Sequence, residues 1–332
     1  MIKTLSWTTM ISWTLALVLF SGPQATNTVA LPNASEFPKF DASSLPVIAK
    51  IHIGGDPDWL GIGFGSVWVS VPKNNEVVRI NPQNNQIEAR IKVGEDPCYG
   101  IGIGEKHVWV LNCKSQSLVR IRPRDNTVDQ VNSVRIAPHG EGGIAVGKDA
   151  VWYVSNQDGH SSTLIELNGH ATKAVTVGTD SAVVNSAFRA IWVTSSGEGK
   201  IYRIDPKRHT VVATITVPAT PRFTATDKQS VWVLSQSDGS VSRIDPAANK
   251  VSASIAAGIP GAGGDIASGG GYIWVAASGT PVTRIDPKTN KVVYQYGNYK
   301  GADAIRFGYG ALWVSDHGKG DVWKIDPQKL GR

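Results

Sequence analysis

Residues 231–246 read V-W-V-L-S-Q-S-D-G-S-V-S-R-I-D-P, and the chain repeats this pattern throughout. A short apolar strand surrounds a tryptophan, small polar residues follow, and a second strand ends in R-I-D-P or a close relative. The tryptophan recurs seven times, at intervals of 39 to 43 residues. The seven positions are Trp68, Trp109, Trp152, Trp192, Trp232, Trp274 and Trp313. A period near 40 with several strands per unit is typical of a β-propeller.

Each unit is expected to form one blade of four antiparallel strands. In the second unit, residues 100–104 alternate Gly with Ile and predict the innermost strand, where Gly permits close approach at the axis. Residues 108–112, 117–121 and 127–136 predict the next three strands outward. We therefore expect an all-β, seven-bladed β-propeller with four antiparallel strands per blade.

The last unit lacks an outer strand, because only a few residues follow Asp326-Pro327. Residues 47–57 match residues 87–97 position for position. We therefore expect the N-terminal strand 47–53 to complete the last blade, which is otherwise built from 303–326. Pairing the first strand with the last removes open sheet edges.

The repeated side chains have structural interpretations. A large flat indole fills the widening gap between twisted sheets, so the seven tryptophans are predicted to lie in the core. Each Asp-Pro pair predicts a tight turn. The Arg before it, as in Arg243, is expected at the surface with its stem packed down. The third unit departs from the pattern and reads E-L-N-G at 166–169.

The N-terminus differs from the repeats. Residues 10–20 form an apolar run behind Lys3, followed by small and polar residues, which predicts a signal peptide over 1–30. The run is shorter than the ~20 residues of a membrane span, so membrane contact is expected only through an uncleaved signal segment. We expect a flexible lead-in at 31–46, the propeller at 47–332, and a secreted or periplasmic location.

Three segments carry a family resemblance: V-W-V strands, V-T-R-I-D-P-K-T-N-K-V at 282–292, and I-K-V-G-E-D-P at 91–97. They resemble exported seven-bladed propellers of the YVTN/YncE type over 47–332. They are also similar to the streptogramin (virginiamycin B) lyase superfamily, which implies ester opening by elimination with a metal ion and a His base. Where those lyases usually read W-F-T-E, this chain reads W-V-T-S at 192–195 and W-V-L-S at 232–235, so no catalytic residue is carried over.

The position ten residues before each Trp varies widely, whereas the Trp strands do not. Such variation on a constant scaffold predicts a binding mouth at one end of the central channel. The predicted ligand-binding residues are Asp58, Trp59, Tyr99, Arg222, Phe223 and His317.

Carboxylates at this mouth raise the possibility of a cation. Asp58, Asp265 and Asp303 lie on neighbouring blades, and oxygen ligands of this kind suit Mg²⁺ or Ca²⁺. The alternative is that they are solvated loop acids. His139 with Glu141 is the candidate pair for acid–base catalysis, because a His beside a carboxylate titrates near neutrality. The alternative there is a polar, Gly-rich loop.

The chain has two cysteines, Cys98 and Cys113. In a hairpin that turns near 105–107 they fall almost opposite each other, within reach of a disulfide. An exported protein meets an oxidising compartment, so we predict that they are bonded.

The formal net charge is +6, without a block of like charges, so we expect no nucleic-acid partner. The leading hypothesis is an exported, monomeric propeller that binds a small molecule or protein at its channel mouth. A metal-dependent lyase or hydrolase of streptogramin-lyase type is one alternative, and a structural envelope or surface module is another. A binding mouth should expose Trp59, Tyr99 and Phe223, whereas an enzyme should bring His, Glu and Asp together.

Overall fold

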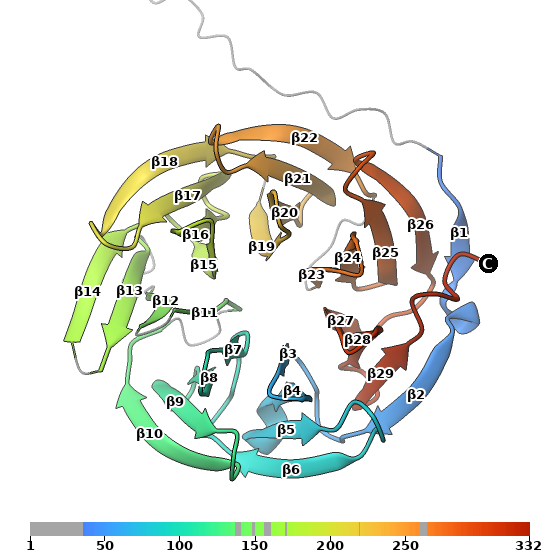
Figure 1. Cartoon of the computed structure of the whole chain (residues 1–332), viewed down its shortest axis with the longest axis horizontal. Helices are drawn as coiled ribbons and strands as arrows, with labels where there is room; N and C mark the ends of the chain where they lie inside the picture. The colour runs from blue at the N-terminus through green and yellow to red at the C-terminus, as the bar shows by residue number, and fades with distance from the viewer. Residues whose placement is uncertain are drawn as a thin grey trace, which may run out of the picture. The chain divides into compact units, whose positions relative to one another are not determined.

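The computed structural model describes residues 36–136, 141–147, 150–155, 161–169, 171–218, 220–258 and 264–332. Seven sheets surround a central axis in residues 36–332, with the innermost strands near the centre and the outermost at the rim (Figure 1). Two 3-10 segments, Ala42–Ser44 and Pro72–Asn74, are the helical elements of the described chain. None of its helices has the length and apolar character needed to cross a membrane.

Blades 1 to 4 follow one another along the chain. Blade 1 contains β3 (Leu60–Gly63), β4 (Ser66–Val71), β5 (Glu76–Ile80) and β6 (Ile87–Lys92). Blade 2 contains β7 (Gly102–Ile103), β8 (Val108–Asn112), β9 (Ser117–Arg122) and β10 (Thr127–Ser133). Blade 3 contains β11 (Ala145–Val146), β12 (Val151–Ser155), β13 (Thr163–Asn168) and β14 (Ala171–Thr176). Blade 4 contains β15 (Ser181–Ala187), β16 (Ala190–Ser195), β17 (Lys200–Asp205) and β18 (Thr210–Thr216).

Blades 5 to 7 complete the ring. Blade 5 contains β19 (Pro221–Thr226), β20 (Val231–Ser235), β21 (Ser240–Asp245) and β22 (Lys250–Ala256). Blade 6 contains β23 (Asp265–Gly269), β24 (Tyr272–Ala277), β25 (Thr280–Asp286) and β26 (Lys291–Gly297), to which β1 (Lys39–Asp41) adds a fifth strand. Blade 7 contains β27 (Ala302–Gly308), β28 (Ala311–Asp316), β29 (Asp321–Ile325) and β2 (Val47–His52).

The predicted closure of the ring is confirmed. Strand β2 pairs antiparallel with β29, with Val47 opposite Ile325 and His52 opposite Asp321. The two ends of the propeller therefore share one sheet, and blade 7 has the same four strands as the others.

The predicted flexible lead-in differs from the structure at its C-terminal end. Strand β1 pairs parallel with β26, and Phe40 stacks on Tyr296 at 5.1 Å between ring centroids. Leu330 is buried in the same apolar cluster. The aromatic side chains of β26 thus give the lead-in a surface to cover, which its Pro- and Ser-rich composition did not indicate.

The seven repeated tryptophans lie between blades, as predicted. Six of them have relative exposures of 2% or less, and only Trp109 is half-buried. Each stands opposite a residue of the third strand of its blade, such as Arg243 opposite Trp232. The indoles therefore form the main contact surface from one blade to the next.

A second contact joins the blades on the side where the Asp-Pro turns lie, which we call the turn face. The guanidinium carbon of Arg243 lies 5.1 Å from the Trp232 ring centroid. Its Nη1 donates to the carbonyl of Pro287 at 2.7 Å and to the Asn290 side chain at 3.1 Å, both on the turn of the next blade. We call this set, an indole and a cation bound to the following turn, the interblade clamp.

The interblade clamp recurs at four junctions. The cations, with their acceptors in the next turn, are Arg79 with Pro123 and Asn126, Arg203 with Pro246 and Asn249, Arg243 with Pro287 and Asn290, and Lys324 with Pro82 and Asn85. The Asn residues have positive φ values between 53° and 62°. Asn tolerates this left-handed conformation better than most residues, so one side chain both closes the turn and accepts the cation.

The expectation that these arginines lie at the surface is wrong for their charged ends. The Arg79 side chain is only 16% exposed, and its guanidinium is hydrogen-bonded on three sides. The turn of the neighbouring blade, which is 44 residues away in sequence, covers it. In a single isolated blade the guanidinium group would be exposed to solvent, whereas in the ring the neighbouring blade buries it.

At the junction of blades 3 and 4, the acceptor and the donor of the clamp exchange places. Glu166 takes the place of the cation opposite Trp152, and His209 takes the place of Asn in the next turn, with φ of 56°. The imidazole stacks on Trp152 at 5.6 Å, and its Nε2 lies 2.5 Å from Glu166 Oε2. The departure of the third unit from the repeat is thus matched by His209 one blade later.

We expect that Glu166→Arg combined with His209→Asn restores the common clamp. Glu166→Arg alone places a cation against His209 and should lower the free energy of unfolding by about 1–3 kcal/mol, the usual range for hydrogen bonds to charged groups. The double variant should recover most of this loss. Denaturant unfolding of the four proteins gives the coupling free energy.

Arg208→Asn, an exposed change in the same turn, is the control and should be nearly neutral. If the losses in free energy of unfolding caused by Glu166→Arg and His209→Asn simply add in the double variant, these two residues do not form the equivalent of the clamp.

Candidate functional site

Residues from five blades meet at the other end of the sheets, which we call the mouth face. A small hollow there, too narrow to hold a water molecule, is lined by Asp58, Trp59, Glu141, Phe223, Gly264, Asp303 and Ala304. They lie in or next to the innermost strands of blades 1, 3, 5, 6 and 7. Most of these positions are those that the variable register of the sequence indicated. The fold therefore brings the predicted mouth residues of these blades together.

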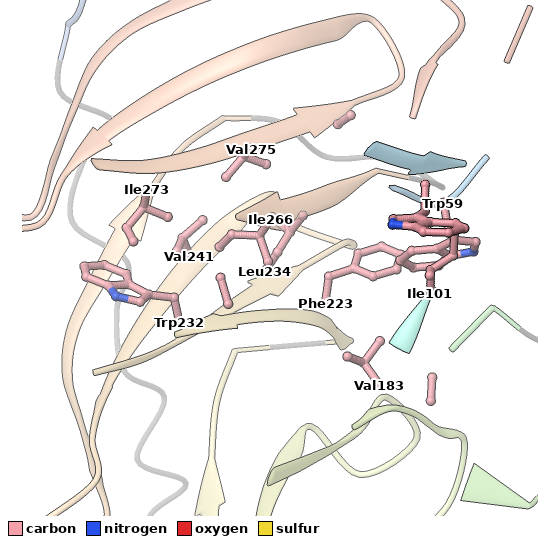
Figure 2. Close-up of a cluster of buried hydrophobic side chains, with 14 of the residues drawn as sticks. Trp59, Ile101, Val183, Phe223, Trp232, Leu234, Val241, Ile266, Ile273 and Val275 are labelled. Atoms are coloured by element: carbon pink, nitrogen blue, oxygen red, sulfur yellow. The ribbon is translucent and has the colours of Figure 1, made fainter. Parts of the chain in front are cut away.

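An aromatic plug closes the centre of the mouth. Trp59 of blade 1 and Phe223 of blade 5 approach across the axis, with ring centroids 5.7 Å apart (Figure 2). The indole Nε1 of Trp59 donates to the carbonyl of Cys98 at 3.0 Å, which fixes the ring. Ile101 lies against them in the same cluster. Blades that are not neighbours in the ring are thus joined through its centre.

The expectation of exposed aromatic side chains at the mouth is wrong. Trp59, Tyr99 and Phe223 have relative exposures of 5%, 1% and 1%. A Cβ built on Gly142 would lie only 2.1 Å from the Tyr99 ring, so this glycine makes room for the tyrosine. The rings fill the centre because the inner strands converge there and apolar surface is stabilised by leaving water.

Acidic side chains surround the plug. Asp58 is hydrogen-bonded to Asp303, which requires a proton between the two carboxyl groups. Burial, together with the charge of Asp303, raises the pKa of Asp58 well above its usual range. Burial also raises the pKa of Glu141, in part against the attraction of Arg222.

Two basic side chains balance part of this charge. Arg222 Nη2 lies 3.3 Å from Glu141 Oε2, and His317 Nε2 lies 4.0 Å from Asp56 Oδ2. The Nε atom of Arg222 is buried and finds no acceptor among the described residues. Arg222 and His317 thus lie at the mouth, as predicted, each beside an acid.

Of the three predicted metal ligands, Asp265 already has partners in the folded chain. Asp265 Oδ2 binds Arg306 and accepts from the backbone of Ile305, while Oδ1 accepts from Ile266. Burial raises the pKa of Asp265 to about 6 against the pull of Arg306. Within the described residues, the one group of three potential ligand atoms lying within 4.8 Å of one another is Asp96, Cys98 and Cys113.

The predicted catalytic pair is placed only in part. Glu141 lies at the mouth, but His139 lies outside the described residues.

The predicted disulfide is present. Cys98 and Cys113 are bonded, with their Cα atoms 5.8 Å apart. The bond ties the loop before β7 to the end of β8, and the carbonyl of Cys98 is the acceptor of the Trp59 indole. The disulfide therefore supports the aromatic plug as well as blade 2.

Arg306 is the residue that sequence reasoning missed. It stands opposite Trp313 in the inner strand of blade 7. The equivalent position in five other blades is Gly or Ala, as in Gly61 and Ala267. Asn185 occupies it in blade 4. An Arg at a position where most blades have Gly or Ala could have indicated from the sequence that this side chain forms a buried ion pair.

Comparisons of the sequence with models of protein families and with curated proteins give no match. Solved structures show the same fold at low identity. The β-propeller domain of Cps50 (Swd1) from Myceliophteria thermophila is 8% identical, with a TM-score of 0.69, covering 85% of this chain and 99% of that one. BamB from Moraxella catarrhalis is 12% identical, with a TM-score of 0.58, covering 85% and 100%. The RRP9 WD40 repeats are 9% identical, with a TM-score of 0.67, covering 85% and 98%. These likenesses establish the fold alone.

The acidic mouth makes stability depend on pH. Asp58, Glu141 and Asp265 have raised pKa values, so the folded chain binds more protons than the unfolded chain between about pH 4 and their folded values. Their contribution to stability is therefore lost as pH rises. Acids with lowered pKa values, such as Asp205 and Asp245, stabilise the fold at neutral pH, and this contribution is lost only when they are protonated at lower pH.

We expect the free energy of unfolding to be higher at pH 5 than at pH 7.5, by on the order of 2 kcal/mol. Asp58→Asn should flatten this slope, because it removes the shared proton. Denaturant unfolding at several pH values measures it, with Glu95→Gln as an exposed control that keeps the slope. An unchanged slope in Asp58→Asn would exclude the carboxyl pair as its source.

Proposed function

We propose that this chain is an exported propeller of the YVTN/YncE kind that binds a ligand or partner protein at the mouth face through a cationic group. The observation that carries the proposal is the convergence of the carboxyl groups of Asp58, Asp303 and Glu141 on one hollow. Asp58 and Asp303 lie at the register that varies from blade to blade. A primary ammonium or guanidinium group would supply a positive charge opposite these acids.

The cost of this arrangement supports a binding role. Like-charged carboxyl groups that lie together, partly withdrawn from water, disfavour folding. The Glu141–Arg222 ion pair and the hydrogen bond from Gly264 to Asp303 offset only part of this cost. Costly groups of this kind collect at functional sites, where binding offsets the cost. The hollow is too narrow to enclose a small molecule. A ligand would therefore place only its charged end against the carboxyl groups, from outside the mouth.

Export is part of the proposal. The signal-like sequence of residues 1–30 supports it, and so does the Cys98–Cys113 disulfide, because disulfides persist mainly in oxidising compartments. A lyase is the less supported alternative, because Asp265, one of its predicted metal ligands, already binds Arg306.

We expect a trilysine peptide to bind the intact protein at low salt, and Asp303→Asn to weaken binding at least tenfold. The neutral amide keeps the size of the side chain but cannot become the anion that an ammonium needs. Isothermal titration calorimetry of the wild type and the variant measures the change. Glu95→Gln, a matched change on the same face but outside the hollow, should bind as the wild type does.

Salt separates this site from general attraction to an acidic surface. Binding by the half-buried pair should persist in part at 150 mM salt, whereas attraction between exposed charges is largely screened there. Equal affinity in wild type and Asp303→Asn would refute the proposed site.

A further inference from the structure

The junction of blades 2 and 3 is the place where the interblade clamp is incomplete. Arg120 stands opposite Trp109, as the clamp requires, with its guanidinium carbon 5.7 Å from the ring centroid. The turn that should cover it is short. Asn168 pairs directly with Ala171 in blade 3, whereas Asp205 pairs with Thr210 in blade 4. Blade 3 thus has two turn residues where blade 4 has four.

A cavity of ≈ 270 Å³ occupies the place of the missing turn. Blade 2 lines it with His107, Trp109 and Arg120, and blade 3 lines it with Val146 and Leu167. The two blades that line it, β7–β10 and β11–β14, are neighbours in the ring (Figure 1). Its lining includes residues of the turns at 104–107 and 169, so it lies on the turn face. It is therefore separate from the acidic mouth.

Hydrogen-bond donors of Arg120 that a covering turn would satisfy face this cavity. The Nε atom of Arg120 donates to Asp129 at 2.7 Å, but none of the described residues accepts from its two terminal nitrogens. The matching Nη1 of Arg243 has two acceptors in the next turn. Trp109 is half-buried, whereas the other six repeated tryptophans are covered.

We propose that the gap between blades 2 and 3 is a docking slot for a tight turn of the form Pro-x-x-Asn carried by a partner protein. The turn would present to Arg120 the carbonyl and side-chain oxygens that the chain's own turns present at four other junctions. Its apolar edge would cover Trp109. The partner's turn would therefore bind Arg120 and Trp109 in the same way as the chain's own turns bind the cation and the indole at the other junctions.

The charges around the slot favour an uncharged turn. Lys106, Arg120 and Arg122 lie near Glu105 and Asp129, and Arg122 also pairs with Asp125. Cations and anions are therefore balanced. Neutral oxygen acceptors match this environment better than a polyanion.

The partner is a different protein rather than a second copy. The Asn-containing turns at 82–85, 123–126, 246–249 and 287–290 are each bound to the preceding blade, and the turn at 206–209 is bound through His209. Leu330, at the matching position of blade 7, is buried at the chain's own end. A further turn of this form, Pro72–Asn75, is also occupied, because the Asn75 side chain accepts from the backbone of Asp96. Among the described residues, a second copy therefore has no spare turn of this kind to offer.

The test uses a disulfide-closed hairpin peptide with the sequence of residues 285–292, I-D-P-K-T-N-K-V. We expect it to bind the full chain and to slow oxidation of Trp109 by N-bromosuccinimide, which mass spectrometry locates. Arg120→Met should weaken binding at least tenfold. Arg124→Met removes an exposed arginine outside the cavity and should leave peptide binding unchanged. A peptide in which Ala replaces the Asn should bind the wild type as weakly as the original peptide binds Arg120→Met.

A second variant fills the slot within the chain. Replacing residues 168–170 by D-P-K-T-N should protect Trp109, raise the melting temperature by a few degrees and abolish peptide binding. The proposal is overturned if the peptide protects Trp109 equally in Arg120→Met, or if the longer turn leaves both Trp109 reactivity and the melting temperature unchanged. It also fails if the peptide binds but Trp109 reacts as before.

Discussion

The stacking of an indole against a cation, with the next blade's turn bound to that cation, is the contact on which this ring depends. Inside a single blade, hydrogen bonds between strands suffice, but nothing in them fixes one sheet against the next. Trp232 and Arg243 supply that contact, and Asn290 of the following blade completes it. Cation–π stacking is worth about 0.5–2 kcal/mol, and hydrogen bonds to charged groups about 1.5–3 kcal/mol. Repeated around the ring, such terms are comparable with the whole stability of a domain.

The clamp also explains the tolerance of the repeat to change. Glu166 and His209 exchange the roles of hydrogen-bond donor and acceptor, and His, like Asn, accepts the left-handed conformation that the turn imposes. At the junction of blades 6 and 7, Arg284 instead donates to Tyr294, and the chain end covers the gap with Leu330. Only between blades 2 and 3 does the described chain supply no substitute. Variation in the repeat thus has structural meaning once the neighbouring blade is considered.

Much of the fold could be predicted from the sequence because it depends on local patterns. The tryptophan period gave the seven blades, the match of 47–57 to 87–97 gave the closure, and hairpin geometry gave the disulfide. Contacts between distant residues could not be predicted in this way. The packing of Trp59 on Phe223, the pairing of Asp265 with Arg306, and the docking of β1 on β26 all depend on where the ring brings residues together. The variable register gave the mouth positions but not which of them would be buried.

The mouth is built in two layers with opposite demands. The aromatic plug removes apolar surface from water and joins blades 1 and 5 through the centre. The carboxyl groups of Asp58 and Asp303 lie against that apolar layer, which is why desolvation is the largest cause of the raised pKa of Asp58. The plug therefore stabilises the ring and, at the same time, gives the carboxyl pair its affinity for positive charge. Loss of the plug would let water reach the acids and return the pKa of Asp58 toward normal, so the apolar centre and the charged rim act as one unit.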